Sequence, residues 1–280
     1  DISAGQRFEF GANWARFLLV LDEQRIHLAE QSLKTMLGVE TLKGKRFLDI
    51  GSGSGLFSLA ARRLGASVHS FDYDPKSVAC TMELRRRYFP EDPQWLVEEG
   101  SVLDRDYLNT LGQFDVVYSW GVLHHTGAMW QALENVEQLV DLGGRLFVAI
   151  YNDQGGQSRR WRMLKRMYNF IPRHFRPLFA GITMGPRELF FLFVSIVKGK
   201  PLSYFDNVLN YSKRSLRGMS YWRDLIDWIG GYPFEVAKPE MIFAFYYERG
   251  FSLDVLKTCG GSIGCNQFVF TRLGNPVSRK

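Results

Sequence analysis

The chain has 280 residues, of which 46% are hydrophobic, and it carries a formal net charge of +6. This length suits one large α/β domain with an insertion, or two small domains, and the hydrophobic content suffices for a buried core. Three cysteines without paired short spacing argue against a disulfide-rich secreted protein, and no signal-like segment opens the chain. We therefore expect a cytoplasmic protein.

The positive charge is concentrated in one segment. Residues 152–240 contain 15 Lys and Arg against 7 Asp and Glu, whereas the rest of the chain contains 20 against 22. Such a segment can attract nucleic acid, an anionic membrane or an acidic substrate, and it can equally be a solvated helix face.

The N-terminal 45 residues place aromatic side chains at positions 8, 10, 14 and 17, followed by a helical pattern through Leu28, Leu33 and Leu37. This pattern predicts a helical segment that packs on the core or closes over a ligand. The candidates for such a lid are Gln6, Phe10, Asn13 and Trp14.

Residues 47–72 form the stretch with the strongest functional signal. An apolar strand at 47–50 leads into Gly51, Gly53 and Gly55, whose backbone can turn tightly against a ligand. A helical pattern and a second strand follow, and that strand ends on Asp72. In Rossmann-like βαβ units an acidic residue about 20 positions after the glycine loop binds ribose hydroxyls, so we expect this role for Asp72.

The glycine spacing distinguishes between nucleotides. A dinucleotide site has the pattern G-x-G-x-x-G, but here Gly55 comes one residue early and Leu56 occupies the place of the third glycine. This weakens the case for NAD. The run LDIGSGSG with Asp72 resembles motif I and the second-strand acid of class I S-adenosylmethionine-dependent methyltransferases. The resemblance covers most of the chain except about 152–240, and it implies S-adenosylmethionine as cofactor and S-adenosylhomocysteine as product.

Two later segments extend this resemblance. The strand at 95–97 leads to Gly100, after which the family commonly has an acidic residue that binds the adenine amino group. Ser101 stands there and can still accept a hydrogen bond, while the Val102 N–H can serve a ring nitrogen. The strand at 114–119 leads to WGVLHH, which resembles the family motif whose backbone lies beside the methionine part of the donor.

The candidate site residues follow from these motifs. We expect His124 or His125 to deprotonate or orient the acceptor, and Tyr151 to help close the pocket. Substrate contacts are expected from Asn152, Tyr232 and Asn266. No metal site is predicted, because no carboxylate or cysteine has ligand spacing to the histidines. The resemblance implies that the cofactor is bound by Trp14, Asp49, Gly51, Ser52, Gly53, Gly55, Asp72, Tyr73, Ser101, Val102 and Trp120.

The order of elements predicts an α/β fold, Rossmann-like and doubly wound, with a mostly parallel seven-stranded sheet. After a helix at 128–140 and a fifth strand at 145–151, the alternation breaks and resumes with a helix at 239–250 and a closing strand pair. We therefore expect an N-terminal helical cap at 1–45, a core at 46–151 and 239–280, and a basic, aromatic-rich helical insertion at 152–238 that forms a substrate lid.

The insertion begins with a basic and aromatic stretch at 159–176, which is a candidate for binding an anionic surface. Residues 178–197 are apolar, but this run is interrupted by Gly181, Gly185, Pro186, Arg187 and Glu188. This interruption predicts a helical hairpin over the cleft and no transmembrane segment, with membrane association as an alternative.

The runs at 116–140 and 230–261 resemble ubiquinone-biosynthesis-type O-methyltransferases and related small-molecule methylases. We therefore expect transfer of a methyl group to a small-molecule oxygen by in-line displacement. RNA and lipid acceptors stay open, although no strong nucleic-acid signal is present. Alternatives of other classes are a nicotinamide-dependent oxidoreductase and a non-catalytic nucleic-acid- or cofactor-binding protein. The oligomeric state is left open.

Overall fold

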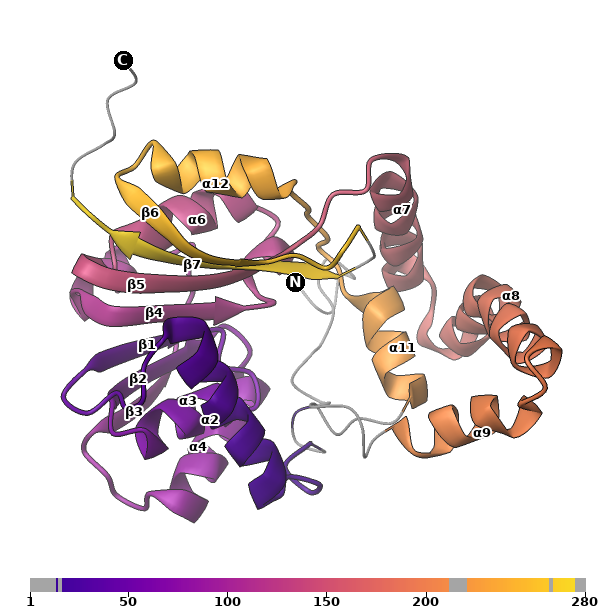
Figure 1. Ribbon diagram of the computed structural model, residues 1–280, viewed down its shortest axis with the longest axis horizontal. Helices are drawn as coiled ribbons and strands as arrows, with labels where there is room; N and C mark the ends of the chain where they lie inside the picture. Colours follow the sequence, from indigo (N-terminus) through magenta and orange to yellow (C-terminus); the bar gives the residue numbers. More distant parts are fainter. Residues whose placement is uncertain (1–13, 15–16, 212–220, 262–263, 275–280) are drawn as a thin grey trace.

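The computed structural model describes residue 14 and residues 17–211, 221–261 and 264–274. A seven-stranded sheet in the order β3-β2-β1-β4-β5-β7-β6 forms the centre of the fold (Figure 1). The strands are β1 Arg46–Ile50, β2 Ser67–Asp72, β3 Trp95–Glu99, β4 Phe114–Trp120, β5 Val140–Tyr151, β6 Phe251–Lys257 and β7 Cys265–Arg272. Strands β1 to β5 pair in parallel, and β7 pairs antiparallel with β5 and β6. The predicted Rossmann-like α/β fold is therefore confirmed.

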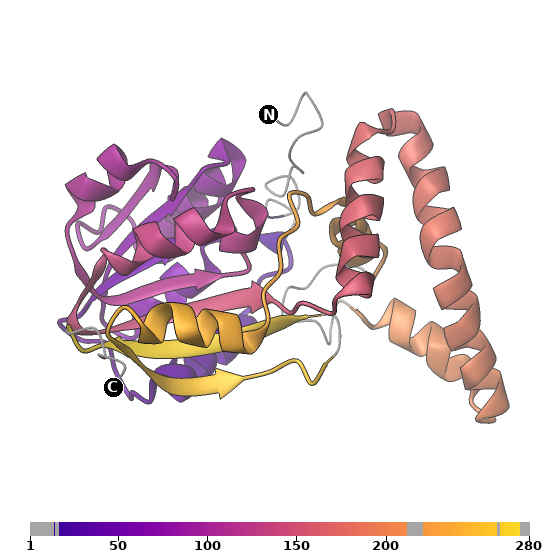
Figure 2. The same cartoon turned by 90° about the horizontal axis from the view of Figure 1, so that it is seen from above.

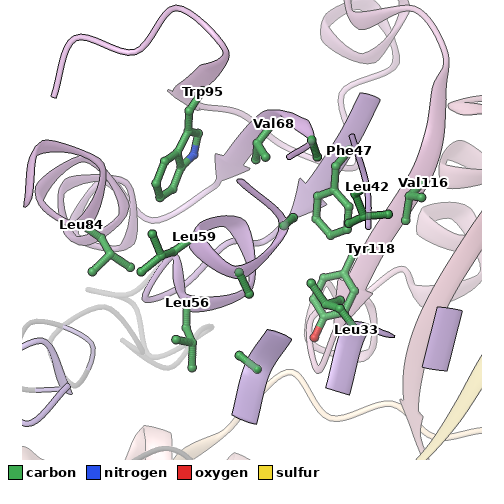
Figure 3. Packing of buried hydrophobic residues seen from close by; sticks show 14 of the residues in the cluster. Leu33, Leu42, Phe47, Leu56, Leu59, Val68, Leu84, Trp95, Val116 and Tyr118 are labelled. Carbon is green, nitrogen blue, oxygen red and sulfur yellow. The ribbon is translucent and has the colours of Figure 1, made fainter. Parts of the chain in front are cut away.

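Helices cover both faces of the sheet, because alternate residues of each buried strand point to opposite sides. Phe47 packs in one cluster with α2, α3 and α4, whereas its neighbour Leu48 packs in another with α5, α6 and α12. Figure 3 shows the first cluster, where Leu59 of α3 and Leu84 of α4 face Trp95 of β3. These helices are α2 Glu23–Leu37, α3 Leu56–Arg63, α4 Pro75–Tyr88, α5 Arg105–Leu111, α6 Met129–Glu137 and α12 Pro239–Tyr247.

Two helices at the carboxyl edge of the sheet begin at capping carboxylates. Asp74 accepts a hydrogen bond from the Lys76 N–H at 2.9 Å, and Pro75 occupies the first turn of α4. Asp104 accepts from the Tyr107 N–H at 3.0 Å at the start of α5. Both caps fix the loops that follow β2 and β3.

The boundary between α6 and β5 differs from the prediction. The helix ends at Glu137 rather than Val140, and the strand begins at Val140 and runs through Gly143 and Gly144. Val140 already pairs with Phe114, and the register shifts before the regular pairing resumes. The two glycines therefore form an irregularity inside the strand, not a turn before it.

The described residues between β5 and α12 are mostly helical, and they lie beside the carboxyl end of the sheet (Figures 1 and 2). Helices α7 and α11 are next to the sheet, and α8 lies farther out. Tyr168, Met184, Leu225 and Ile229 form a small core of their own. The helices are α7 Gly156–Phe170, α8 Arg176–Val197, α9 Pro201–Leu209 and α11 Tyr221–Gly230.

The predicted break within residues 178–197 is wrong, because α8 continues through Pro186. A proline in a helix removes one backbone hydrogen bond but need not end the helix when neighbouring contacts hold it. Here the buried Glu188 accepts hydrogen bonds from the hydroxyls of Tyr204 and Tyr221, at 2.9 and 2.7 Å. These bonds fasten the middle of α8 to α9 and α11, and the hairpin turn lies after Val197 instead.

We predict that Phe147→Ala lowers the free energy of unfolding by about 3 to 5 kcal/mol, because it empties a buried aromatic site in a well-packed core. Phe147 is buried in β5 and its ring lies 5.0 Å from that of Tyr118. Urea unfolding followed by circular dichroism measures the change. Leu142→Ala in the same strand is the control, because Leu142 is exposed and should change stability by about 0.5 kcal/mol or less. Equal effects of both substitutions would contradict this packing.

Candidate active site

The glycine loop joins β1 to α3 and is shaped by its neighbours. The backbone N–H groups of Gly51 and Ser52 donate to the Phe71 carbonyl oxygen at 2.9 and 3.1 Å. Gly51 has φ of 73°, and a Cβ there would lie 2.4 Å from a methyl carbon of Val122. Only glycine therefore fits at this position, and Val122, which follows β4, closes directly on the loop.

Asp72 stands at the carboxyl end of β2, as the sequence predicts. One carboxylate oxygen accepts from the Gly53 N–H at 3.0 Å, and the other accepts from the Asp74 N–H at 2.9 Å. A carboxylate offers about four acceptor sites over its two oxygens. The same residue thus holds the loop and has the acceptor chemistry that a hydroxylated ligand requires.

A pocket opens beside this carboxylate. Its wall combines the apolar side chains of Phe71, Val102 and Leu103 with Asp72, Tyr73 and Ser101. The Ser101 hydroxyl accepts from the Leu103 N–H at 3.2 Å, which fixes the turn after β3. An apolar slot with a carboxylate at one end suits a flat, partly apolar ligand that carries hydroxyl groups.

Asp49 lies behind the loop in a buried polar chain. Its carboxylate accepts from the Ser58 hydroxyl, which in turn accepts from Ser70 at 2.8 Å, and the Trp95 indole N–H donates to Ser70 at 3.0 Å. Burial raises the pKa of Asp49 from its usual 3.8 to about 7; the Ser58 hydrogen bond opposes this rise and the charge of Asp72 adds to it. This chain therefore links β1 to α3, β2 and β3 inside the core.

The other predicted cofactor residues lie around the same loop. The Trp14 indole lies over Gly53, where an added Cβ would approach it within 3.2 Å. The Ser52 hydroxyl is 3.0 Å from that of Thr81, and Trp120 is the last residue of β4. The lid candidates Gln6, Phe10 and Asn13 lie outside the residues that the structure describes.

A second group of side chains lies where β4 and β5 end. His124 and His125 are buried in the short 3-10 helix Leu123–His125. Their ring centroids lie 4.0 and 5.5 Å from that of Tyr151, the last residue of β5. The Nδ1 atom of His125 is 2.6 Å from the Pro233 carbonyl oxygen. Because a carbonyl oxygen only accepts, Nδ1 donates this bond, and Nε2 of the neutral ring is the nitrogen that can accept a proton.

Helices α7 and α11 supply the outer wall of this second group. The ring centroid of Tyr151 lies 5.6 Å from that of Trp228 and 5.2 Å from that of Phe234. Lys165 is fully buried, with its ammonium 4.1 Å from the Trp228 ring centroid and 4.8 Å from that of Phe234. Sequence reasoning placed Lys165 within an exposed basic run and missed its burial.

The three predicted substrate residues occupy different positions. The Asn266 amide donates to the Asn152 side-chain oxygen at 3.1 Å and accepts from the Cys259 N–H at 3.1 Å, so these two asparagines join the end of β5 to β7. Tyr232 is half-buried and precedes Pro233, the partner of His125. Among the described residues, no group of three or more His, Cys, Asp or Glu is arranged to hold a metal ion.

Comparisons with known proteins agree with this fold. A family model described as a methyltransferase domain matches residues 21–180. A tRNA U34 carboxymethyltransferase of Pseudomonas aeruginosa is 33% identical over 42% of this chain and 35% of its own length. A ubiquinone biosynthesis O-methyltransferase of Caulobacter sp. is 31% identical over 41% of this chain and 44% of its own length. The chain thus spans less than half the length of these curated relatives.

Solved structures show the same fold at low sequence identity. Magnesium protoporphyrin IX methyltransferase from Synechocystis PCC 6803, solved with bound S-adenosylhomocysteine, aligns over 93% of both chains with a TM-score of 0.54 and 15% identity. An O-methyltransferase family protein from Burkholderia thailandensis aligns over 89% of this chain and 57% of its own, with a TM-score of 0.51 and 11% identity.

The sheet order, the glycine loop and the carboxylate after β2 define a class I S-adenosylmethionine-dependent methyltransferase. The chain belongs to the methyltransferase-domain family. The residues of the site fit the cofactor of this class: Asp72 has acceptor capacity for a ribose diol, and the slot beside it has the apolar walls that an adenine ring requires.

We predict that Asp49→Asn removes a pH dependence of stability. The folded protein binds the Asp49 proton more tightly than the unfolded chain, so this stabilisation is complete below the usual pKa of 3.8 and is lost as pH rises through about 7. Relative to wild type, Asp49→Asn should gain about 4 kcal/mol in unfolding free energy between about pH 4 and about pH 8.

Urea unfolding at a series of pH values measures this difference. Asp115→Asn is the control with the opposite sign, because Lys45 and a backbone N–H lower the pKa of Asp115 despite its partial burial. If the unfolding free energies of wild type and Asp49→Asn change in parallel with pH, the raised pKa of the buried Asp49 is contradicted.

Proposed function

We propose that this protein transfers the methyl group of S-adenosylmethionine to an oxygen atom of a small-molecule acceptor. The observation that carries the proposal is the connection between the two parts of the site through Val122. Its side chain closes on Gly51 of the cofactor loop, and the 3-10 helix that begins at the next residue carries His125. The candidate base is therefore built onto the wall of the cofactor pocket.

Named residues have distinct tasks in this proposal. Asp72 accepts hydrogen bonds from the ribose hydroxyls, and the Val102 N–H with Ser101 binds the adenine edge. When bound, the cofactor supplies an electrophilic methyl group on a sulfonium. The glycine loop and Trp14 enclose the methionine part, and the chain aligns the acceptor for in-line attack, which can contribute several kcal/mol to the rate.

His125 is the better candidate for the base of the two histidines. Its Nδ1 atom donates to Pro233, which leaves Nε2 to take the acceptor proton, whereas His124 is fully buried against Tyr151. Tyr151, Trp228 and Phe234 form an aromatic wall that excludes water and suits a flat acceptor. The relative named for ubiquinone biosynthesis O-methylation supports this acceptor class.

We predict that Asp72→Ala weakens S-adenosylmethionine binding by at least about tenfold. The substitution removes hydrogen bonds to a charged carboxylate, which are worth about 1.5 to 3 kcal/mol. Isothermal titration measures the dissociation constant. Asp104→Ala is the matched control, since Asp104 caps α5 after the neighbouring strand and has no ligand role in this account. Unchanged affinity in a folded Asp72→Ala protein would exclude the proposed ribose contact.

We predict that His125→Asn lowers kcat by about 10² to 10⁴ and leaves cofactor affinity unchanged, because asparagine can still donate to Pro233 but cannot take a proton. Formation of S-adenosylhomocysteine with a panel of hydroxylated aromatic compounds measures turnover. His124→Asn is the neighbouring comparison. Wild-type kcat in His125→Asn across the pH range would remove the base role and favour an acceptor that needs no deprotonation.

An RNA acceptor is the second candidate. The Pseudomonas aeruginosa relative is named a tRNA U34 carboxymethyltransferase, and α7 exposes several arginines. Incubation with labelled S-adenosylmethionine and bulk tRNA separates the two: label in the tRNA favours this candidate, and label only in small molecules favours the first.

A further inference from the structure

Helix α8 exposes an apolar stripe to solvent. Ile182, Leu189 and Phe193 are 68%, 68% and 61% exposed, although they are large apolar side chains. At 100° per residue they lie on the side of the helix opposite the buried Met184 and Glu188. Leu178, 63% exposed, extends the stripe on α8. We name these four residues the α8 surface.

The α8 surface is too apolar for an ordinary solvated helix face. An amphipathic helix of a soluble domain turns its apolar side to the core and its charged side to water. Contiguous exposed apolar patches mark sites of interaction with a partner or a membrane. The exposed stripe of α8 therefore indicates that another molecule covers this helix when the protein functions.

The charges around the surface identify the kind of partner. From residue 156 to residue 209, all of which the structure describes, the exposed acidic residues number one, Asp206. The exposed basic residues in the same range are Arg159, Arg160, Arg162, Arg166, Arg173, Arg187, Lys198 and Lys200. This part of the chain is therefore strongly basic, and apolar side chains on a basic helical segment match the chemistry of an anionic lipid surface.

The contacts of Glu188 decide how α8 meets a bilayer. By length and composition alone, Arg173–Val197 is long and apolar enough to cross a membrane, although a single such helix is weak evidence for a span. Because the Glu188 carboxylate is bonded to Tyr204 and Tyr221, the inner side of α8 is attached to α9 and α11. Only the outer stripe can then meet lipid, so α8 would lie along the interface.

We propose that the α8 surface docks on an anionic phospholipid bilayer, with its apolar side chains at the boundary between headgroups and acyl chains and the exposed Lys and Arg of this segment against the headgroups. Helix α7 connects this surface to the aromatic wall of the candidate active site, since it carries Lys165. The docked protein would hold that site close to the membrane. The proposal is independent of the acceptor and of methyl transfer.

Vesicle flotation tests the proposal on the full chain. Wild type should float with vesicles of phosphatidylcholine and phosphatidylglycerol in equal parts, and much less with phosphatidylcholine alone. Leu189→Glu/Phe193→Glu should reduce the partition coefficient by at least about tenfold, because it removes two apolar anchors. Lys198→Gln/Lys200→Gln should reduce it by roughly fivefold for each residue on the anionic vesicles alone.

The matched control is Leu142→Glu/Leu273→Glu, which adds the same charge far from α8. These two leucines belong to the sheet domain and are 66% and 62% exposed to solvent. It should float like wild type, and circular dichroism checks that each variant is folded. Failure of wild type to float, or flotation of Leu189→Glu/Phe193→Glu equal to wild type, would overturn the proposal. If wild type does not float but is a dimer, and Leu189→Glu/Phe193→Glu makes it a monomer, the surface binds a second copy of the chain. If wild type binds poly(U) RNA and not vesicles, the surface binds RNA.

Discussion

The Asp72 carboxylate connects the end of one strand to the loop that follows another. Its hydrogen bonds to Gly53 and Asp74 hold the glycine loop and the start of α4 around one pocket. Parallel strands make this possible, because their carboxyl ends meet at one edge of the sheet and their following loops face the same crevice. In the core, the buried chain from Asp49 to Trp95 joins β1, α3, β2 and β3.

Val122 extends this arrangement to the second half of the site. Because its side chain fills the space beside Gly51, the loop after β4 cannot move away from the glycine loop without opening a cavity. The two histidines and Tyr151 therefore have a fixed place relative to the pocket beside Asp72. The segment after β5 then completes the wall with Trp228, Phe234 and the buried Lys165. The apolar side of α8 that carries Leu189 and Phe193 faces solvent.

The sequence predicts the fold and the glycine turn after β1 well because their signals are local. The glycine run and the strand that ends on Asp72 each depend on residues a few positions apart. Three features depend on distant contacts instead. Helix α8 continues through Pro186 with Glu188 held by two tyrosines, Lys165 is buried by α11, and His125 meets a carbonyl of Pro233. No spacing in the sequence reports such pairs.

Amide hydrogen exchange with and without S-adenosylmethionine tests the central claim that one pocket, built around Asp72, binds the cofactor. The account predicts slower exchange in the loop 51–55, at 72–74 and at 100–103 when the cofactor is added, and unchanged exchange along α9. Protection that avoids these three segments while the protein is saturated with cofactor would contradict it.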